Sequence, residues 1–337
     1  MSDTSLLQVE DLFVHFPLRR RTPFSPRQTV RAVDGVSFQV RKGSTFGIVG
    51  ESGSGKTTTA LAVMRLTPLT AGRMQLGGDV LSALEGDVLR HARRRVQMIF
   101  QDPYSSLNPR MRAGAIVEEP LELMGIGNEA DRHARAAELF AQVGLRPDQL
   151  QLFPHQFSGG QRQRIGIARA LSTRPELVVC DEPVSALDVA IQAQILNLLV
   201  KLQQEYGLTY LFISHDLGVV QYLCDEVAVM YLGRIVEQAP REALFADPLH
   251  PYTWALLSAV PRVGRRRRGG GARVRLEGDP PSPINPPPGC RFSTRCPFAE
   301  ARCRSEEPKL REFASGHRVA CHLVRDDGTT PLRPKEL

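Results

Sequence analysis

Eight consecutive residues, Gly50 to Thr57, constrain the fold of this chain more than any other stretch, because they read G-E-S-G-S-G-K-T. An apolar run of strand type, residues 44–49, precedes them, and a helix-compatible run, residues 58–65, follows. In this context glycines let the backbone wrap closely around a polyphosphate, and the start of the helix directs N–H groups toward it. Lys56 would reach the β and γ phosphates, and the Thr57 hydroxyl would ligate Mg²⁺. The stretch therefore predicts an α/β fold that binds ATP or GTP, without specifying the reaction.

The length and charge of the chain set wider bounds. Its 337 residues are enough for two or three domains, and its formal net charge is +7. That charge suits a nucleotide, an acidic membrane surface or nucleic acid, and does not choose among them. No apolar run approaches the roughly 18 residues of a membrane-spanning helix, and the N-terminus lacks a signal-peptide pattern. We therefore expect a soluble, cytosolic protein that reaches a membrane only through partners.

The region before the phosphate loop predicts strands. Residues 6–16 read as an opening strand and residues 17–31 as a basic loop. Asp34–Gly35 predicts a turn into a second, half-exposed strand, residues 36–40, so we expect an antiparallel patch. Phe16, near the end of the first strand, is expected on the sequence alone to belong to the core, with stacking on adenine as the alternative.

The middle of the chain predicts a helical insert. A buried strand, residues 96–100, ends at Gln101, and the pattern then becomes helical over roughly residues 104–156. Within it, Asn128 and Asp131 predict the start of a helix that ends before Gly144. Ser158-Gly159-Gly160-Gln161 then precedes a basic amphipathic helix, and a Ser-Gly-Gly at a helix start is a second geometry suited to an anion.

Two carboxylates follow the next apolar run. Leu177–Cys180 predicts a buried parallel strand that presents Asp181 and Glu182 at its C-terminal end, with a solvated turn as the alternative. After a helix that closes near Gly207, a further strand, residues 208–213, brings His215 to the same edge of the sheet. Residues 227–231 and 234–238 then predict a closing hairpin.

Beyond about residue 239 the composition changes. Arg265–Arg268 reads as part of a flexible basic linker, with nucleic-acid contact as a minority alternative. Residues 280–288 are rich in proline and are expected to be extended.

Four cysteines crowd this tail: Cys290, Cys296, Cys303 and Cys321. In a reducing compartment, such crowding favours a metal over disulfides. The spacing of the four cysteines lacks the short C-x₂₋₄-C pair that is typical of structural zinc sites. Four thiolates nevertheless suit either Zn²⁺ or an iron–sulfur cluster. His317 and His322 are substitute ligands for zinc, and free thiols in a small docking element are the alternative to any metal.

Taken in order, these motifs resemble the nucleotide-binding subunit of ATP-binding cassette (ABC) transporters over most of residues 6–240. Gly50 to Thr57 matches the Walker A loop, Gln101 the Q-loop, Ser158–Gln161 the family signature, Leu177–Asp181 the Walker B strand followed by Glu182, Ser185–Asp188 the D-loop and His215 the switch histidine. Phe157 departs from the Leu of many members, but both side chains are apolar. The resemblance implies a P-loop NTPase core with an antiparallel β subdomain and a helical subdomain (104–156), followed by a small Cys-rich C-terminal extension (241–337).

The resemblance also implies roles for residues in ATP hydrolysis. Glu182 would polarise the attacking water, His215 would touch the γ-phosphate, and Gln101 would lie between the metal and the helical insert. Mg²⁺ would be held by Thr57, Gln101 and Asp181. The residues implied at the nucleotide are Phe16, now as the adenine-stacking aromatic, Gly50, Ser52, Gly53, Ser54, Gly55, Lys56, Thr57, Thr58, Asp181, Ser158, Gly159, Gly160, Gln161 and Asp188. In this arrangement Ser158–Gln161 of a partner subunit completes each site, so one chain builds only half-sites.

A narrower resemblance concerns residues 101–111, 248–253 and 278–283 together with the tail cysteines, which look like the ATPase subunits of bacterial oligopeptide and dipeptide importers. Tyr104, Arg110 and the loop at 17–31 lean toward the second of the two paralogous ATPases in such systems. The resemblance implies ATP-driven peptide import and favours a [4Fe–4S] cluster at the cysteines.

The partners implied are an identical or paralogous ATPase, two integral membrane permease subunits and an extracellular peptide-binding protein, with this chain peripheral at the cytoplasmic face of the cell membrane. Nickel and glutathione importers share much of the pattern and stay as alternatives. A soluble ABC-type ATPase acting on nucleic acid is the alternative from another class. We expect no nucleic-acid partner, because no aromatic residues interleave with Arg265–Arg268. The sequence does not specify the transported solute.

Overall fold

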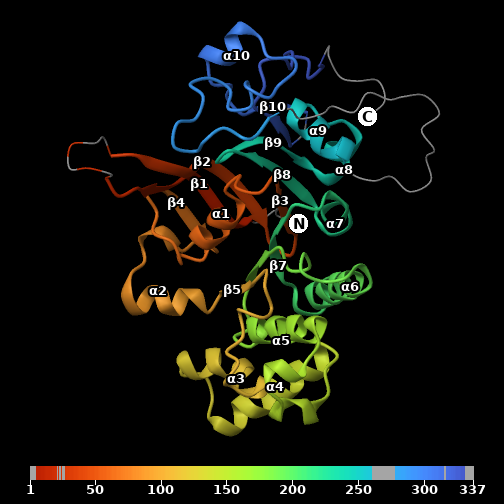
Figure 1. Cartoon of the computed structure of the whole chain (residues 1–337). Helices are drawn as coiled ribbons and strands as arrows, with labels where there is room; N and C mark the ends of the chain where they lie inside the picture. The colour runs from red at the N-terminus through yellow and green to blue at the C-terminus, as the bar shows by residue number, and fades with distance from the viewer. Residues whose placement is uncertain are drawn as a thin grey trace, which may run out of the picture. The chain divides into compact units, whose positions relative to one another are not determined.

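The structure, a computed structural model, describes residues 5–20, 22, 24, 27–259, 278–314 and 316–330 (Figure 1). The chain divides into two compact units, which are described separately below. The first unit comprises Met1–Leu7, Val40–Thr45 and Gln75–Ile213, and the second comprises Gln8–Gln39, Phe46–Met74 and Ser214–Leu337. The second unit therefore contains both the phosphate loop and the C-terminal tail. Arg265–Arg268, read above as a basic linker, lies outside the described residues.

Three parallel strands form the sheet of the first unit, in the order β7-β6-β5. Their bounds are Val96–Ile99 (β5), Leu177–Asp181 (β6) and Thr209–Ser214 (β7). All five residues of β6 are buried, as expected for a continuous apolar run covered on both faces. The prediction of a buried parallel strand ending in a carboxylate is therefore confirmed.

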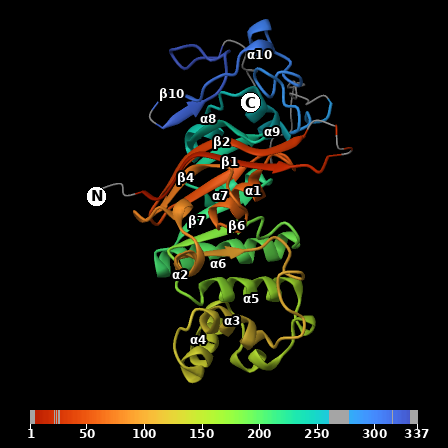
Figure 2. The same ribbon diagram turned by 90° about the vertical axis from the view of Figure 1, so that its left-hand side faces the viewer.

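Helices make up most of the rest of the first unit, and α3, α4 and α5 pack against one another (Figures 1 and 2). α4 begins with a reciprocal capping box, in which the Asn128 side chain accepts from the Asp131 N–H (2.9 Å) and the Asp131 carboxylate accepts from the Asn128 N–H (3.1 Å). α6 ends at Gly207, which has a φ of 64°. The bounds are Gly86–Arg93 (α2), Ala113–Leu123 (α3), Glu129–Gln142 (α4), Gly159–Leu171 (α5) and Val189–Tyr206 (α6), with 3₁₀ turns at Leu81–Ala83, Pro147–Gln151 and Pro154–Gln156. The predicted helical insert is thus present.

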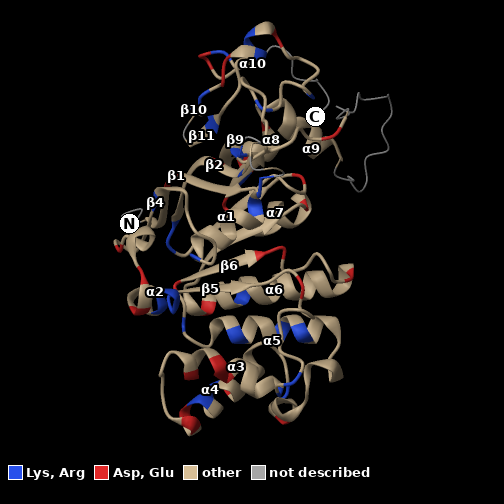
Figure 3. Cartoon of the chain, turned by 60° about the vertical axis from the view of Figure 1, so that its left-hand side comes forward, with Lys and Arg blue, Asp and Glu red and all other residues tan. Residues whose placement is uncertain are grey.

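Charged residues are distributed unevenly among these helices. Figure 3 shows Lys and Arg as blue bands along α5, whereas the charged residues of α3 are all acidic and α4 carries both signs. The helix after Ser158–Gln161 is therefore basic, as its sequence indicates.

The second unit contains a sheet of order β10-β11-β9-β8-β3. β3 (Thr45–Val49), which leads into the phosphate loop, pairs in parallel with β8 (Glu226–Tyr231), and β8 forms an antiparallel pair with β9 (Arg234–Pro240). Two short tail strands, β10 (Arg311–Ala314) and β11 (His317–Val319), extend this sheet along β9. The sequence predicted the β8–β9 hairpin but not the tail strands. The tail therefore continues the sheet that holds the phosphate loop.

A three-stranded sheet of order β2-β1-β4 lies for the most part in the second unit (Figure 2). Its strands are Ser5–Pro17 (β1), Thr29–Arg41 (β2) and Ala71–Leu76 (β4). The turn predicted at Asp34–Gly35 is wrong, because β2 continues through this pair. β2 begins at Thr29, so the loop predicted over residues 17–31 is shorter than expected.

Burial explains why that turn does not form. Asp34 is only 4% exposed, and its carboxylate binds Arg291 and His15. Gly35, at a φ of 87°, lies against the Phe13 ring, where a Cβ would approach to 3.2 Å. Tertiary contacts therefore override a local turn signal that depends only on two residues.

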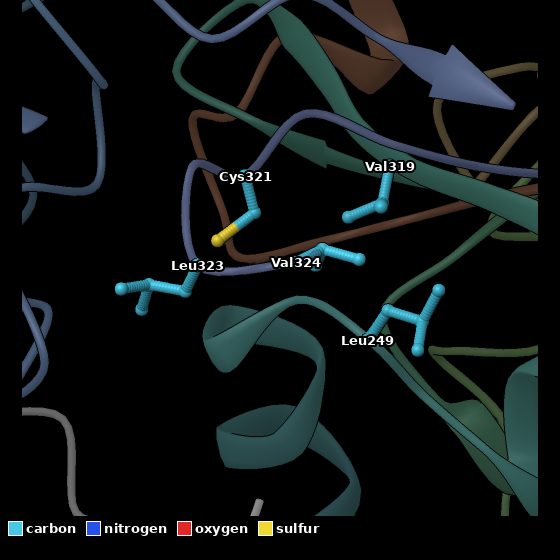
Figure 4. Packing of buried hydrophobic residues seen from close by; sticks show 5 residues of the cluster. All are labelled: Leu249, Val319, Cys321, Leu323 and Val324. Carbon is cyan, nitrogen blue, oxygen red and sulfur yellow. The ribbon is translucent and has the colours of Figure 1, made fainter. Parts of the chain in front are cut away.

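The remaining helices of the second unit are short. Their bounds are Lys56–Val63 (α1), Leu217–Leu223 (α7), Arg241–Ala246 (α8), Pro251–Ala259 (α9) and Ala301–Ser305 (α10). In the tail, a hydrophobic cluster joins Leu249 with Val319, Cys321, Leu323 and Val324 (Figure 4). Within the described part of the chain, no helix is both long and apolar enough to cross a bilayer.

Candidate nucleotide site

The phosphate loop connects the end of β3 at Val49 to the start of α1 at Lys56. Two of its glycines are required by close backbone approach. A Cβ on Gly50 (φ 155°) would lie 2.2 Å from the Met230 carbonyl oxygen, and one on Gly55 (φ 105°) would lie 2.3 Å from that of Ala32. Only glycine fits such positions, because any side chain would both clash and strain the backbone.

The inner side of the loop presents polar groups. The Lys56 ammonium is buried and donates to the carbonyl oxygens of Gly50 and Glu51, each at 2.9 Å. Ser54 Oγ is buried without a hydrogen-bond partner, and the N-cap of α1 is Gly55, which provides no side-chain cap. A buried cation, an unsatisfied hydroxyl and an uncapped helix start together fit a polyphosphate.

The carboxylate pair lies in the first unit. Asp181, the last residue of β6, is 4% exposed, which does not match a solvated turn. Glu182 has a φ of 45°, its N–H donates to the Ile213 carbonyl (2.9 Å), and its Oε2 accepts from Gln101 Nε2 (3.0 Å). A left-handed non-glycine residue costs roughly 1–3 kcal/mol and persists where its surroundings fix it. The structure therefore brings Gln101 and Glu182 into direct contact, which the sequence did not predict.

The Cys180 thiol, next to this pair in the sequence, is expected to be unreactive. Burial, followed by the charge of Asp181, raises the pKa of the Cys180 thiol far above its usual range. The thiol therefore stays protonated and acts as packing.

The Ser-Gly-Gly-Gln motif starts α5. Ser158 is its N-cap and forms a reciprocal capping box with Gln161, whose N–H lies 3.3 Å from Ser158 Oγ. A Cβ on Gly160 would lie 2.6 Å from Ile191 Cγ2, so the glycine permits close packing of α5 on α6. Asp188 in turn caps α6 by accepting from the Ile191 N–H (3.0 Å).

The predicted site residues divide between the two units. Phe16, Gly50–Thr58 and His215 belong to the second unit, whereas Gln101, Ser158–Gln161, Asp181, Glu182 and Asp188 belong to the first. His215 is exposed just beyond β7. Phe16 is 40% exposed, so the expectation from the sequence alone that it belongs to the core is wrong.

The four tail cysteines are not arranged as a metal site in the described part of the chain. Among the residues that the structure describes, no group of three or more His, Cys, Asp or Glu side chains is arranged to hold a metal ion. Burial raises the pKa of Cys290 and Cys296 to about 11 and that of Cys321 to about 12. These three thiols are therefore protonated near neutral pH.

The two substitute histidine ligands are engaged elsewhere. His317 Nε2 lies 2.8 Å from the buried Glu237 carboxylate, and His322 Nε2 lies 2.9 Å from the Glu306 carbonyl. Among the described residues, neither histidine belongs to a group of three or more potential metal ligands.

The structure also reveals partners of the phosphate loop that the sequence did not single out. Arg295 and Tyr252 both contact Glu51, the second residue of the loop. Tyr252 belongs to the segment 248–253 that carries the family resemblance, whereas nothing in the sequence marks Arg295 apart from its position next to Cys296.

A strand–loop–helix phosphate site, a buried parallel strand ending in Asp-Glu and a capped Ser-Gly-Gly-Gln helix define an ATP-binding protein of the P-loop class. Comparison with known protein families and solved structures identifies the family within this class. The profile of the family described as ABC transporter matches residues 33–185, and that described as Oligopeptide/dipeptide transporter, C-terminal region, matches residues 236–303.

Two curated relatives match along nearly their whole length. A probable peptide ABC transporter ATP-binding protein of Sinorhizobium fredii, y4tS, is 50% identical, with 100% of this chain and 95% of the relative covered. The oligopeptide transport ATP-binding protein AppF of Bacillus subtilis is 49% identical, with 95% and 97% covered. A solved dimeric structure of the ATP-binding cassette MJ0796, in a post-hydrolysis state with ADP and phosphate, is 27% identical with a TM-score of 0.61 over 70% of this chain and 98% of that one. The chain therefore belongs to the ABC transporter family, among its ATP-binding proteins.

Proposed function

We propose that this chain is the ATP-hydrolysing subunit that powers the import of peptides across the bacterial cytoplasmic membrane. The observation that carries the proposal is the phosphate loop, with the buried Lys56 and the unsatisfied Ser54 Oγ beside an uncapped helix start. Relatives of about 50% identity over the whole chain are named as peptide and oligopeptide transport ATP-binding proteins, which favours peptides over nickel, glutathione or nucleic acid.

In this proposal the residues divide the chemistry among them. Lys56 offsets phosphate charge, and the Thr57 hydroxyl and Asp181 are the groups that would hold Mg²⁺, which supplies charge neutralisation at the transferred phosphoryl group. Glu182 orients and polarises the attacking water, and His215 contacts the γ-phosphate. Phosphoryl transfer depends on such positioning and electrostatics more than on covalent chemistry.

Gln101 has a supporting role at Glu182. Its Nε2 donates to Glu182 Oε2 at 3.0 Å, and it lies just ahead of the helical insert in the sequence. We expect this hydrogen bond to connect the state of the insert, which would bind the membrane subunits, with the orientation of the carboxylate.

The complete site would be shared by two ATPase subunits, identical or paralogous. Ser158–Gln161 of one subunit would close over the phosphate loop of the other, with Phe16 stacked on adenine. The solved dimeric state of the related cassette supports this arrangement. The remaining partners are two membrane permease subunits and an extracellular peptide-binding protein, with the chain peripheral at the cytoplasmic face.

A [4Fe–4S] cluster at the four tail cysteines stays part of the proposal, with Zn²⁺ as the alternative. Its support is the crowding of four cysteines in the tail sequence, together with the match of residues 236–303 to the family described as Oligopeptide/dipeptide transporter, C-terminal region. Iron and sulfide analysis with visible absorption of anaerobically purified protein tests it. Colourless protein without iron would refute the cluster and leave four free thiols.

The test of the ATPase assignment is Glu182→Gln in the assembled transporter. We expect ATP binding to persist while steady-state hydrolysis falls at least about 100-fold, because the general base is lost. Glu242→Gln is the matched control, since that side chain is 91% exposed on α8. Hydrolysis near the wild-type rate in Glu182→Gln would refute the role of Glu182.

A further inference from the structure

Arg295, in the C-terminal tail, forms an ion pair with Glu51 of the phosphate loop. The Arg295 guanidinium binds the Glu51 carboxylate with two hydrogen bonds, Nη1 to Oε2 at 2.7 Å and Nη2 to Oε1 at 3.2 Å. The Arg295 side chain is 6% exposed and that of Glu51 27%. Two-pronged pairing at low exposure fixes orientation as well as charge, unlike a solvated surface pair.

The backbone of Glu51 is held at the same time. Its N–H donates to the Tyr252 hydroxyl at 2.8 Å, and its carbonyl accepts from the Lys56 ammonium at 2.9 Å. Tyr252 is fully buried and packs against the buried ring of Phe292, with ring centroids 5.4 Å apart. The tail segment that carries Arg295 therefore also supports the tyrosine behind the loop.

A second anchor keeps this tail segment in place. Arg291 is 6% exposed, donates to the Leu232 carbonyl at 2.6 Å and pairs with the buried carboxylate of Asp34. Between the two arginines the chain forms a tight turn, in which the Arg295 N–H donates to the Phe292 carbonyl (3.0 Å). Arg295 is therefore presented to Glu51 from a segment with little freedom to move.

The charge of Glu51 makes this contact relevant to nucleotide. A carboxylate in a loop that wraps a triphosphate opposes the binding of that anion unless a cation offsets it. We propose that Arg295 is a positioning residue of the nucleotide site, which fixes the phosphate loop through Glu51 and offsets its charge, so that the C-terminal tail sets the affinity for ATP. The inference rests on the proposed ATP-binding function.

The primary test measures Mg-ATP affinity of the full chain with Arg295→Gln. We expect the dissociation constant to rise on the order of tenfold, equivalent to about 1.4 kcal/mol. In the assembled transporter, KM for ATP rises while kcat at saturating ATP stays within about twofold, because the chemical step does not use Arg295. Arg295→Lys restores part of the affinity, since lysine supplies the charge without the fork.

The control is Arg302→Gln in α10 of the same tail. Arg302 pairs with Glu306 on an exposed surface, and we expect wild-type affinity from this variant. Unchanged affinity in Arg295→Gln, or an equal loss in both variants, would overturn the inference.

The double variant Glu51→Gln/Arg295→Gln separates charge and positioning from general loss of folding. Removing both charges abolishes the same contact, yet leaves no uncompensated carboxylate in the loop. We expect its affinity to be no lower than that of Arg295→Gln, a strong non-additivity, because the same contact is lost only once. Additive losses would show that Arg295 acts only through stability and would refute the proposal. A wild-type chain that fails to bind ATP would instead refute the proposed function itself.

Discussion

Replacing His250 by Asn is expected to make the folded chain less sensitive to acid. His250 is 1% exposed, packs against the Phe292 ring, and its Nδ1 accepts from the Tyr252 N–H at 3.0 Å. Burial lowers the pKa of His250 from 6.5 to about 4, against the opposing effect of the Glu237 charge. The imidazole therefore remains neutral in the folded chain under conditions where the unfolded chain binds a proton.

The sign and size of the effect follow from these two pKa values. Between pH 6.5 and about pH 4 the unfolded state binds more protons, so stability is complete above 6.5 and falls as the pH is lowered through this window. The slope approaches about 1.4 kcal/mol per pH unit. Between pH 7 and pH 5, His250 alone then removes about 2 kcal/mol from the free energy of unfolding.

Urea unfolding of the full chain at a series of pH values measures this loss. His250→Asn keeps an acceptor near the position of Nδ1 without a group that titrates in this range, so its stability should fall by about 2 kcal/mol less than that of wild type between pH 7 and pH 5. His133→Asn, on the exposed surface of α4, should behave as wild type. Equal acid sensitivity of wild type and His250→Asn would refute the reasoning.

Two further outcomes are expected. Gly160→Ala should lower the free energy of unfolding by about 1–3 kcal/mol, because the new methyl group would clash with the β-branched Ile191 side chain. Gly166→Ala, in the same helix, places its methyl group where no atom lies within 4 Å, so it should raise the free energy of unfolding by up to about 1 kcal/mol. Urea midpoints of the two variants that shift in the same direction would contradict these two expectations. At Asp34, burial alone would raise the pKa, but hydrogen bonds from Arg291 and His15 lower it overall, so the carboxylate stabilises the fold above its unfolded pKa of 3.8 and loses this effect as the pH falls through the lower folded value. Asp34→Asn should therefore lower Tm at neutral pH by an amount that shrinks below about pH 4, and a pH-independent difference would argue against the ion-pair account.

Local signals in the sequence predicted elements well where neighbouring residues supply the cause. Asn128 and Asp131 satisfy each other's backbone across a single turn, so the start of α4 is readable from four residues. The turn predicted at Asp34–Gly35 was wrong for the opposite reason. Its turn signal is local, but Asp34 is fixed by Arg291, which lies 257 positions away in the sequence.

The cysteines show a second limit. Their number and crowding can be read from the sequence, but the arrangement of their sulfur atoms and the state of their thiols depend on burial. Cys321 lies within the hydrophobic cluster of Leu249, Val319, Leu323 and Val324, where its thiolate is disfavoured (Figure 4).

The sequence by itself determined the phosphate loop, because its glycines, lysine and threonine act through the backbone of one strand–loop–helix segment. The sequence also determined the strand that ends in Asp181, since a continuous apolar run has few other uses. Only the tertiary structure decided that Arg295 meets Glu51, 244 positions away, and that the tail strands extend the sheet carrying that loop. An ion pair between distant residues has no local signal, since it forms only after the tail has docked.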